Sequence, residues 1–237
     1  MINNMTPTIE EYLEALFHLR DKGKAVSTKD LAEHLKIAPA SVTDMIKKLA
    51  DKKLVIHTPY KGAILTKNGL KAAAALVRRH RLSERFLADM LGVPWEDLHD
   101  EACKFEHVIS DQVEEKLLEA LGNPKTCPHG NPIPTSDGSI VEDMSIPLTS
   151  FNPKETGTIT KIKEENPEFL HYLASLGLFP KVCIEVKEIA PFSGPIIIKT
   201  RGASYALGRD VACNIFLHPD TEVKKRLKHG KTRRKGV

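Results

Sequence analysis

Residues 99–117, HDEACKFEHVISDQVEEKL, combine two histidines, a cysteine and several carboxylates with few large apolar side chains. If this stretch is a helix with 100° per residue, four of the donors fall within one stripe about 100° wide. These four are His99, Cys103, Glu106 and His107. A hydrophobic core avoids such a set of polar side chains unless they bind something. The spacing therefore predicts a metal site on one face of this helix.

A second pair of donors precedes this stretch. In RRHRLSERF, His80 and Glu84 are spaced i, i+4, which places both on one face of the preceding predicted helix. Two antiparallel helices that face each other would build one or two sites from these groups. Imidazole, carboxylate and a single thiol suit Fe(II), Mn(II), Co(II) or Ni(II), whereas a structural zinc site normally uses more cysteines.

Catalytic uses of the 99–107 stretch fit less well. A zincin requires H-E-x-x-H, but the residue four positions after His107 is Asp111. A cysteine nucleophile would pair Cys103 with His107 or His99, yet no nucleophile-presenting turn or oxyanion hole is recognisable nearby. A metallohydrolase and a metal-storage or chaperone protein are nevertheless kept as alternative interpretations of a metal site in this stretch.

The region before these donors has the pattern of a DNA-binding module. An amphipathic helix over 9–22 precedes a helix capped by Ser27 or Thr28, and a second helix starts near Pro39. Two β runs, LVIHT and AILT, follow and are joined through PYKG. This order is that of a winged helix-turn-helix, whose second helix enters the major groove. The expected DNA-contact residues are Ser27, Thr28, Pro39, Ala40, Ser41, Thr43, Asp44, Lys47, Lys48 and Lys61.

Composition is that of an ordinary globular protein, with 41% hydrophobic and 28% charged residues. No apolar run is long enough for a spanning helix, and the acidic N-terminus does not fit a signal peptide. Four scattered cysteines suit a reducing cytoplasm, and Cys183 and Cys213 are expected to be buried. Cys127 and His129 lie in a proline-rich stretch and could meet a metal, but a surface or structural role is favoured.

Positive charge is concentrated at the C-terminus. The segment 224–237 carries eight of the 35 Lys and Arg residues and no acid, so the rest of the chain has 27 basic against 31 acidic residues. Such a block favours a polyanionic partner. A solubilising end is the alternative interpretation.

Three runs, HRLSERFLADMLG, HDEACKFEHVISDQVEEKL and GNPIP, resemble the diphtheria-toxin-repressor and manganese-transport-regulator family of metal-dependent repressors. The resemblance covers about residues 6–218 and implies a mainly α fold with β. Its parts are a winged helix-turn-helix, a helical dimerisation and metal-binding domain, and a small FeoA- or SH3-like β-barrel. The expected boundaries are 1–72, 73–134, a linker at 135–150, the β domain at 151–220 and a basic tail at 221–237.

The resemblance also implies two metal sites. The primary, regulatory site would use Cys103, Glu106 and His107, with Glu11 from the first helix. The ancillary site would use two side chains from the β domain, for which ENPEF offers Glu165 and Glu168, together with His80, Glu84 and His99. Glu14 matches an additional carboxylate ligand of the manganese-sensing branch.

The primary set is a hybrid of the two branches. The iron-sensing type shares the cysteine but has a thioether at the position of Glu11, whereas the manganese-sensing type has carboxylates at both positions. Oxygen ligands favour Mn(II) and a thiolate favours Fe(II) or a tighter-binding metal. We therefore expect Mn(II) or Fe(II), with Co(II), Ni(II) or Zn(II) able to bind in vitro.

By this resemblance, the protein is a cytoplasmic, homodimeric repressor that binds palindromic operator DNA and controls metal-ion homeostasis genes. Apolar residues of the helices after the wing would form the dimer contact. It is expected to have no enzymatic activity, no small-molecule substrate and no membrane partner.

Overall fold

The structure is a computed structural model of the chain and describes residues 5–20, 24–141 and 144–220. The basic tail predicted at 221–237 lies outside the described residues. The chain divides into two compact units. Unit 1 comprises Met1–Ser83, Cys103–Gly122 and Ile133–Val141, and unit 2 comprises Glu84–Ala102, Asn123–Pro132 and Glu142–Val237.

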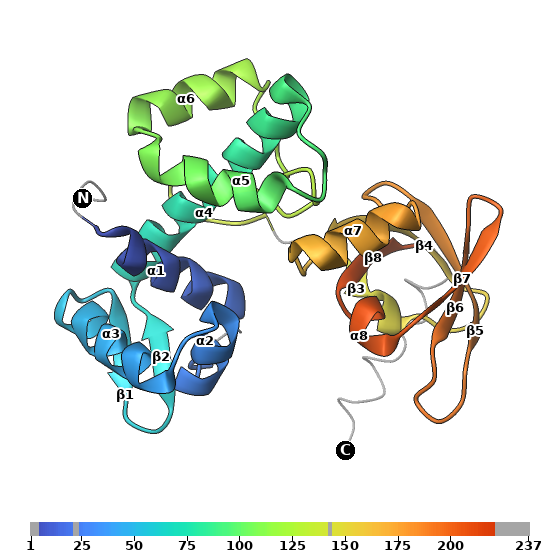
Figure 1. Cartoon of the computed structure of the whole chain (residues 1–237), viewed down its shortest axis with the longest axis horizontal. Coiled ribbons are helices and arrows are strands. Elements are labelled where there is room, and N and C mark those ends of the chain that lie inside the picture. The colour runs from blue at the N-terminus through green and yellow to red at the C-terminus, as the bar shows by residue number, and fades with distance from the viewer. Residues whose placement is uncertain (1–4, 21–23, 142–143, 221–237) are drawn as a thin grey trace, which may run out of the picture. The chain divides into compact units, whose positions relative to one another are not determined.

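Unit 1 begins with a winged helix-turn-helix, as predicted (Figure 1). Ser27 caps the second helix, because its Oγ accepts a hydrogen bond from the Asp30 backbone N–H at 3.0 Å. Pro39 is the first residue of the third helix, where its missing N–H costs nothing. The elements are α1 (Pro7–Leu19), α2 (Thr28–Leu35), α3 (Pro39–Asp51), β1 (Val55–Thr58) and β2 (Gly62–Leu65).

The core of this module consists of the residues that helical periodicity selects. Val42, Ile46 and Leu49 of α3 are completely buried, and they lie at the spacing that gives one face of a helix. Leu13 and Leu16 of α1 pack into the same core cluster. Packing of α1 against α2 and β2 makes the first helix an integral part of the DNA-binding module.

The donor-rich stretch 99–117 is not one continuous helix, which corrects the sequence interpretation. It divides into α5 (Leu98–Phe105), the 3-10 helix η1 (Glu106–Val108) and α6 (Asp111–Ala120). Ile109 is extended, and Ser110 then caps α6 by accepting from the Val113 backbone N–H at 3.3 Å. The 3-10 turn rotates Glu106 and His107 away from the directions that a straight α-helix would give them.

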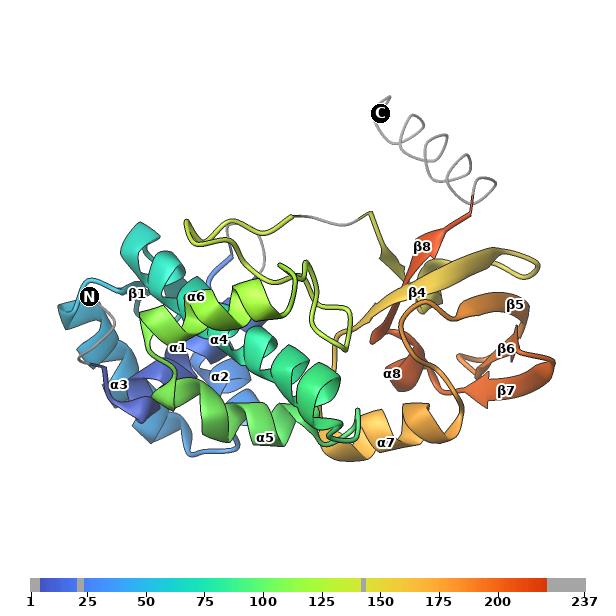
Figure 2. The same cartoon turned by 90° about the horizontal axis from the view of Figure 1, so that it is seen from above.

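The long helix α4 (Lys67–Leu91) precedes this stretch, and the division between the units falls within it. In unit 1, α6 lies alongside α4, as Figure 2 shows. Arg78 Nε donates to Glu114 Oε1 at 2.6 Å, and Arg79 pairs with both Glu114 and Asp111. The Arg78, Arg79 and Glu114 side chains are mostly buried, so the ion pairs among them fix α6 against α4 more firmly than surface pairs would, whereas Asp111 is 77% exposed.

Unit 2 contains an antiparallel six-stranded sheet with the order β3-β8-β4-β5-β6-β7. Its strands are β3 (Ile146–Pro147), β4 (Thr156–Ile162), β5 (Cys183–Ile189), β6 (Ile196–Thr200), β7 (Ala203–Leu207) and β8 (Ile215–Pro219). Strand pairing in the described residues ends at β3 and β7, so the predicted closed barrel is not confirmed. Strand β3 and the 3-10 helix η2 (Leu148–Ser150) lie within the range that was expected to be a linker. Strand β3 belongs to the sheet instead, because Ile146 pairs with Leu217 of β8.

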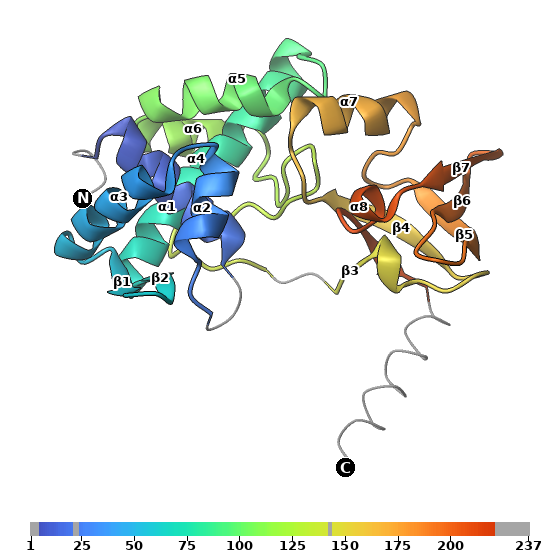
Figure 3. The same cartoon turned by 60° about the horizontal axis from the view of Figure 1, so that its bottom comes forward.

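Two helices, α7 (Pro167–Ser175) and α8 (Arg209–Ala212), accompany the sheet (Figure 3). Leu170 and Leu173 of α7 are completely buried in the core of the sheet. The prediction that Cys183 and Cys213 are buried is wrong, since both are exposed. Cys183 lies on the outer face of β5 because the alternate residues Ile184 and Val186 face the core.

Candidate metal centres and DNA-binding surface

A buried imidazole–carboxylate pair lies at the centre of unit 1. His80 Nδ1 and Glu106 Oε2 are 2.6 Å apart, and the carboxylate accepts the hydrogen bond. His80 comes from α4 and Glu106 from η1, and their side chains are only 2% and 3% exposed. Two groups that can carry charge have thus been removed from water together, which is costly unless further partners compensate.

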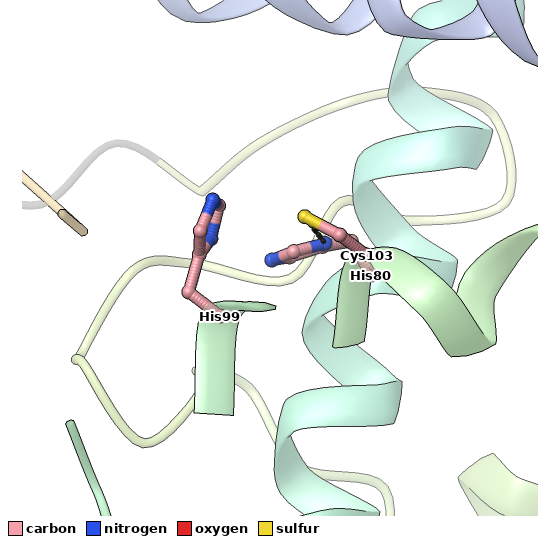
Figure 4. A group of neighbouring side chains, drawn as sticks. All are labelled: His80, His99 and Cys103. Atoms are coloured by element: carbon pink, nitrogen blue, oxygen red, sulfur yellow. Dashed lines mark hydrogen bonds between the residues drawn. The ribbon is translucent and has the colours of Figure 1, made fainter. Parts of the chain in front are cut away.

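Two more donors of unit 1 meet this pair. Cys103 Sγ is 4.0 Å from His80 Nδ1, as Figure 4 shows. Ligand atoms of Glu14, His80 and Glu106 lie within 4.8 Å of one another. The structure therefore brings together Glu14, His80, Cys103 and Glu106 from four elements, α1, α4, α5 and η1.

The charge balance of this cluster favours a cation. Burial raises the pKa of Glu106 above its usual value, and the nearby Glu14 carboxylate raises it further, while the hydrogen bond from His80 opposes the shift. Burial thus makes the ionised carboxylate of Glu106 less stable than it is in water, and a nearby positive charge would offset this effect. Carboxylate, imidazole and thiol donors at this spacing fit a divalent transition metal.

The first helix contributes a different carboxylate from the one expected. Glu10 is buried, and its Oε2 lies 2.6 Å from His107 Nδ1. Glu11 is exposed, and it lines a shallow pocket of about 420 Å³ with Asp44 and Lys48 rather than joining the cluster. The reason is the phase of α1: Glu10 and Glu14 are spaced i, i+4 on one face, from which Glu11 is rotated.

Unit 2 contains a second cluster, in which the predicted ligands Glu84 and Glu165 meet two residues for which a surface or structural role was expected. Ligand atoms of Glu84, Cys127, His129 and Glu165 all lie within 4.8 Å of one another. His129 Nδ1 is 3.1 Å from Glu84 Oε1 and 3.8 Å from Glu165 Oε1. Cys127 and His129 are buried rather than being surface residues of a linker.

The local fold of 127–131 explains how this cluster forms. The Cys127 backbone N–H donates to Asn131 O, and Gly130 has φ +87°, so the segment turns tightly. Trp95 packs edge-on against the His129 ring, with the ring centroids 4.9 Å apart. The signal in the sequence was the Cys-Pro-His spacing followed by a glycine, but the burial that makes it a cluster depends on tertiary contacts.

Protonation in the second cluster is strongly perturbed. Burial raises the pKa of Cys127 to about 11, and the Glu84 carboxylate contributes to the rise. For His129, burial acts to lower the pKa, but the Glu84 carboxylate outweighs it and the pKa is raised well above the usual value. The carboxylate of Glu84 thus favours the protonated form of His129 despite its burial.

The remaining predicted ligands are His99 and Glu168. His99 Nδ1 lies 3.6 Å from Glu165 Oε2 within unit 2. Glu168, in the first turn of α7, is exposed and belongs to none of the donor groups found among the described residues. Its backbone N–H donates to Asn166 Oδ1, which caps α7.

The predicted DNA-contact residues lie mainly on the outer face of α3 and at the wing. Exposed residues of this set are Pro39, Ala40, Ser41, Asp44, Lys47, Lys48 and Lys61. Lys47 Nζ is 3.5 Å from Asp44 Oδ1, so the Asp44 carboxylate forms an ion pair with the neighbouring lysine. Thr43 Oγ1 donates to Pro39 O, and Ser27 Oγ caps α2. The hydroxyls of Thr43 and Ser27 therefore support the helices, whereas Ser41 is available on the surface.

Comparison with known proteins identifies each part of the chain. Residues 4–63 match the N-terminal DNA-binding domain of iron-dependent repressors, and residues 66–135 match the metal-binding and dimerisation domain of the same proteins. Residues 146–219 match the FeoA domain.

Whole-chain similarity agrees with this division. The iron-dependent repressor IdeR of Mycobacterium leprae is 30% identical over 209 residues, which cover 83% of this chain and 90% of that protein. A solved manganese-dependent transcriptional repressor in complex with manganese has a TM-score of 0.82 and 33% identity, covering 90% of this chain and 100% of that one. The structure of ScaR with bound Cd2+ has a TM-score of 0.79 and 32% identity, and the match covers 89% of this chain and 98% of that one. The chain belongs to the iron-dependent repressor family, which includes the diphtheria toxin repressor.

Within the described residues, no helix has both the length and the apolar character that crossing a membrane requires.

Proposed function

We propose that the protein is a metal-dependent transcriptional repressor that binds operator DNA as a homodimer and acts in the cytoplasm on genes of metal-ion homeostasis. The observation that carries this proposal is the cluster of unit 1, because it joins α1 of the DNA-binding module to α4 and η1 through buried donors. Family membership supports the same function.

The residues that would hold a divalent metal are the four of this cluster, Glu14, His80, Cys103 and Glu106, together with His107, whose Nε2 lies 3.6 Å from Glu106 Oε1. A bound Mn(II) or Fe(II) ion supplies positive charge that offsets the repulsion between the buried carboxylates. The chain's own residues then do the regulatory work. With Glu14 held beside His80 and Glu106, α1 is fixed against α4, and α1 packs on α2 and β2. Fixing α1 thus restricts the orientation of the reading helix α3 and raises the population of the DNA-competent state.

The second cluster would hold another metal through Glu84, Cys127, His129 and Glu165, with His99 nearby. This arrangement keeps Glu84 and Glu165 of the expected ancillary set and has Cys127 and His129 in place of His80 and Glu168. Met90 and Leu91, near the end of α4, are apolar and 61% exposed, so they are suited to a dimer contact. A dimer with two-fold symmetry would read a palindromic operator.

The test is DNA binding as a function of metal. An operator duplex is first selected from a random-sequence library with the Mn(II)-loaded full-length protein, and binding is then followed by fluorescence anisotropy under anaerobic conditions. Mn(II) or Fe(II) is expected to tighten binding at least tenfold over chelator-treated protein, and the selected site is expected to be palindromic. Affinity that is the same with chelator and with either metal contradicts the proposal.

Two variants sharpen this test. Glu106→Gln removes a proposed ligand charge from the buried cluster and is expected to abolish the response to metal. Glu115→Gln changes an exposed carboxylate of α6 and is expected to leave the response intact. Hydrolytic turnover that depends on Cys103 and His107 would instead favour a metallohydrolase, and metal binding without DNA binding would favour a storage protein.

A further inference from the structure

Glu10 has a contact that its position in the sequence does not predict. Its carboxylate Oε2 lies 2.6 Å from His107 Nδ1, and the two residues are 97 positions apart in the chain. Only 11% of the Glu10 side chain and 24% of the His107 side chain are exposed. A contact this short and this sheltered differs from an exposed ion pair, which contributes little.

The contact determines which nitrogen of His107 carries the hydrogen. A carboxylate can only accept, so Nδ1 is the donor in this hydrogen bond. In the neutral imidazole, Nε2 then holds the lone pair. His107 Nε2 faces the first cluster, since it lies 3.6 Å from Glu106 Oε1. The nitrogen that can bind a metal is therefore the one that points toward the other donors.

We propose that Glu10 is a positioning residue: its carboxylate holds the Nδ1–H of His107 and thereby presents Nε2 to the metal of the first cluster. This inference rests on the proposed metal-dependent function. It gives α1 two different roles one turn apart, because Glu14 contacts the cluster directly while Glu10 acts through His107. Carboxylates that orient a metal-binding histidine in this way typically affect metal affinity 10–100-fold.

The first readout is the tautomer of His107 in the metal-free, full-length protein. Two-bond 1H–15N spectra of histidine-labelled protein at a pH of about 8.5 distinguish the Nδ1–H from the Nε2–H form, and a His107→Gln variant assigns the signal. The wild type is expected to be the Nδ1–H form, and Glu10→Ala is expected to shift His107 toward Nε2–H. Glu10→Gln keeps an oxygen acceptor, so it is expected to retain the wild-type form. An unchanged His107 signal in Glu10→Ala overturns the inference.

The second readout is Mn(II) affinity by equilibrium titration. Glu10→Ala is expected to weaken binding about 10–100-fold, Glu10→Gln less than about tenfold, and the exposed control Glu115→Ala not at all. Glu11→Ala is the competing variant: a loss of affinity there, with full affinity in Glu10→Ala, overturns the inference. Circular dichroism and thermal unfolding confirm that each variant is folded.

The two readouts separate this inference from the proposed function. A wild-type protein that binds neither Mn(II) nor Fe(II) contradicts the metal-dependent function, whatever the tautomer. A wild-type protein that binds metal, together with a Glu10→Ala variant that keeps both the tautomer and the affinity, contradicts only the role of Glu10.

Discussion

Glu84 and His129 form an ion pair in the interior of unit 2: Oε1 and Nδ1 are 3.1 Å apart, and neither side chain has exposed surface. Burial alone would favour neutral forms of both groups, so this pair depends on mutual attraction and on its neighbours. One of these neighbours is the Trp95 backbone carbonyl, which lies 2.9 Å from His129 Nε2. Each ring nitrogen of His129 thus has an acceptor, as the protonated imidazole requires.

The pH dependence of stability follows from this pair. The pKa of His129 is raised in the folded protein by the Glu84 carboxylate, which outweighs burial. A raised pKa means that the pair stabilises the fold fully below the unfolded value of about 6.5 and that this contribution is lost as pH rises through the folded value. Chelator-treated wild type is therefore expected to lose stability with increasing pH above about 6.5, by up to about 1.4 kcal/mol per unit. Urea titrations at several pH values measure this slope, and His129→Gln is expected to flatten it.

Metal stoichiometry tests the second cluster. Cys127→Ser is expected to lower the metal content from two ions to one per chain, because it removes the only thiol of the unit 2 cluster and leaves the unit 1 donors unchanged. Elemental analysis after desalting measures the content. Cys213→Ser alters an exposed thiol and serves as the control. Equal metal content in wild type and Cys127→Ser would show that the thiol is not required for a second ion.

Substitution of Glu106 is expected to raise the stability of the metal-free protein while removing its response to metal. Burial raises the pKa of this carboxyl, so its ionised form destabilises the metal-free fold at neutral pH. Glu106→Gln removes that charge while keeping an acceptor for His80, and the metal-free variant is expected to unfold at a higher temperature than the metal-free wild type. The same variant is expected to lose the increase in melting temperature that Mn(II) gives the wild type. Differential scanning calorimetry with chelator and with Mn(II) measures both effects.

Gly130 is expected to be irreplaceable by alanine. Its φ is +87°, and an added Cβ would lie 1.9 Å from Thr160 O, a backbone atom that cannot move aside cheaply. Gly122 is the matched control, with φ +73° and nothing within 4 Å of an added Cβ. Gly122→Ala is expected to cost about 1–2 kcal/mol for the left-handed backbone alone. Gly130→Ala is expected to cost about 1–3 kcal/mol more, and chemical denaturation of the two variants gives the difference.

Lys48 is expected to contact a phosphate. It is exposed on α3 beside Asp44 and Lys47, which are predicted DNA-contact residues, and a lysine–phosphate contact releases about one counterion. Lys48→Ala should therefore weaken operator binding about equally for different sequences and reduce the slope of log K against log salt by about 1. Lys116→Ala changes an exposed lysine of α6, which pairs with Glu119, and should leave the slope unchanged.

Helices with one apolar face were predictable from the sequence. Val42, Ile46 and Leu49 repeat at helical spacing, and Ser27 and Pro39 mark helix starts by local chemistry, so the DNA-binding module was predicted correctly. Residues 99–117 were less predictable. Their polar stripe fits an uninterrupted helix. In the structure, however, Ile109 is extended and interrupts the helical path, and Ser110 then caps the next helix, α6.

The sequence did not show which carboxylates and which further donors approach the predicted ligands, because this depends on tertiary contacts. Glu10 and Glu11 are chemically identical neighbours, and only the packing of α1 determines that Glu10 reaches His107. In the sequence, Cys127 and His129 resemble linker residues. In the structure they are buried, with Trp95 packed against His129 and a tight turn at Gly130. Burial of this kind arises from contacts with residues far away in the sequence, which periodicity does not report.

Glu106 and His107 of η1 both contact residues that are distant in the sequence. Glu106 meets a residue 26 positions earlier, and His107 meets one 97 positions earlier. Closing loops of this length costs entropy before any contact is gained. During synthesis, the reading helix α3 emerges well before η1 exists. The newly made protein therefore has a DNA-reading element before it has the means to sense metal.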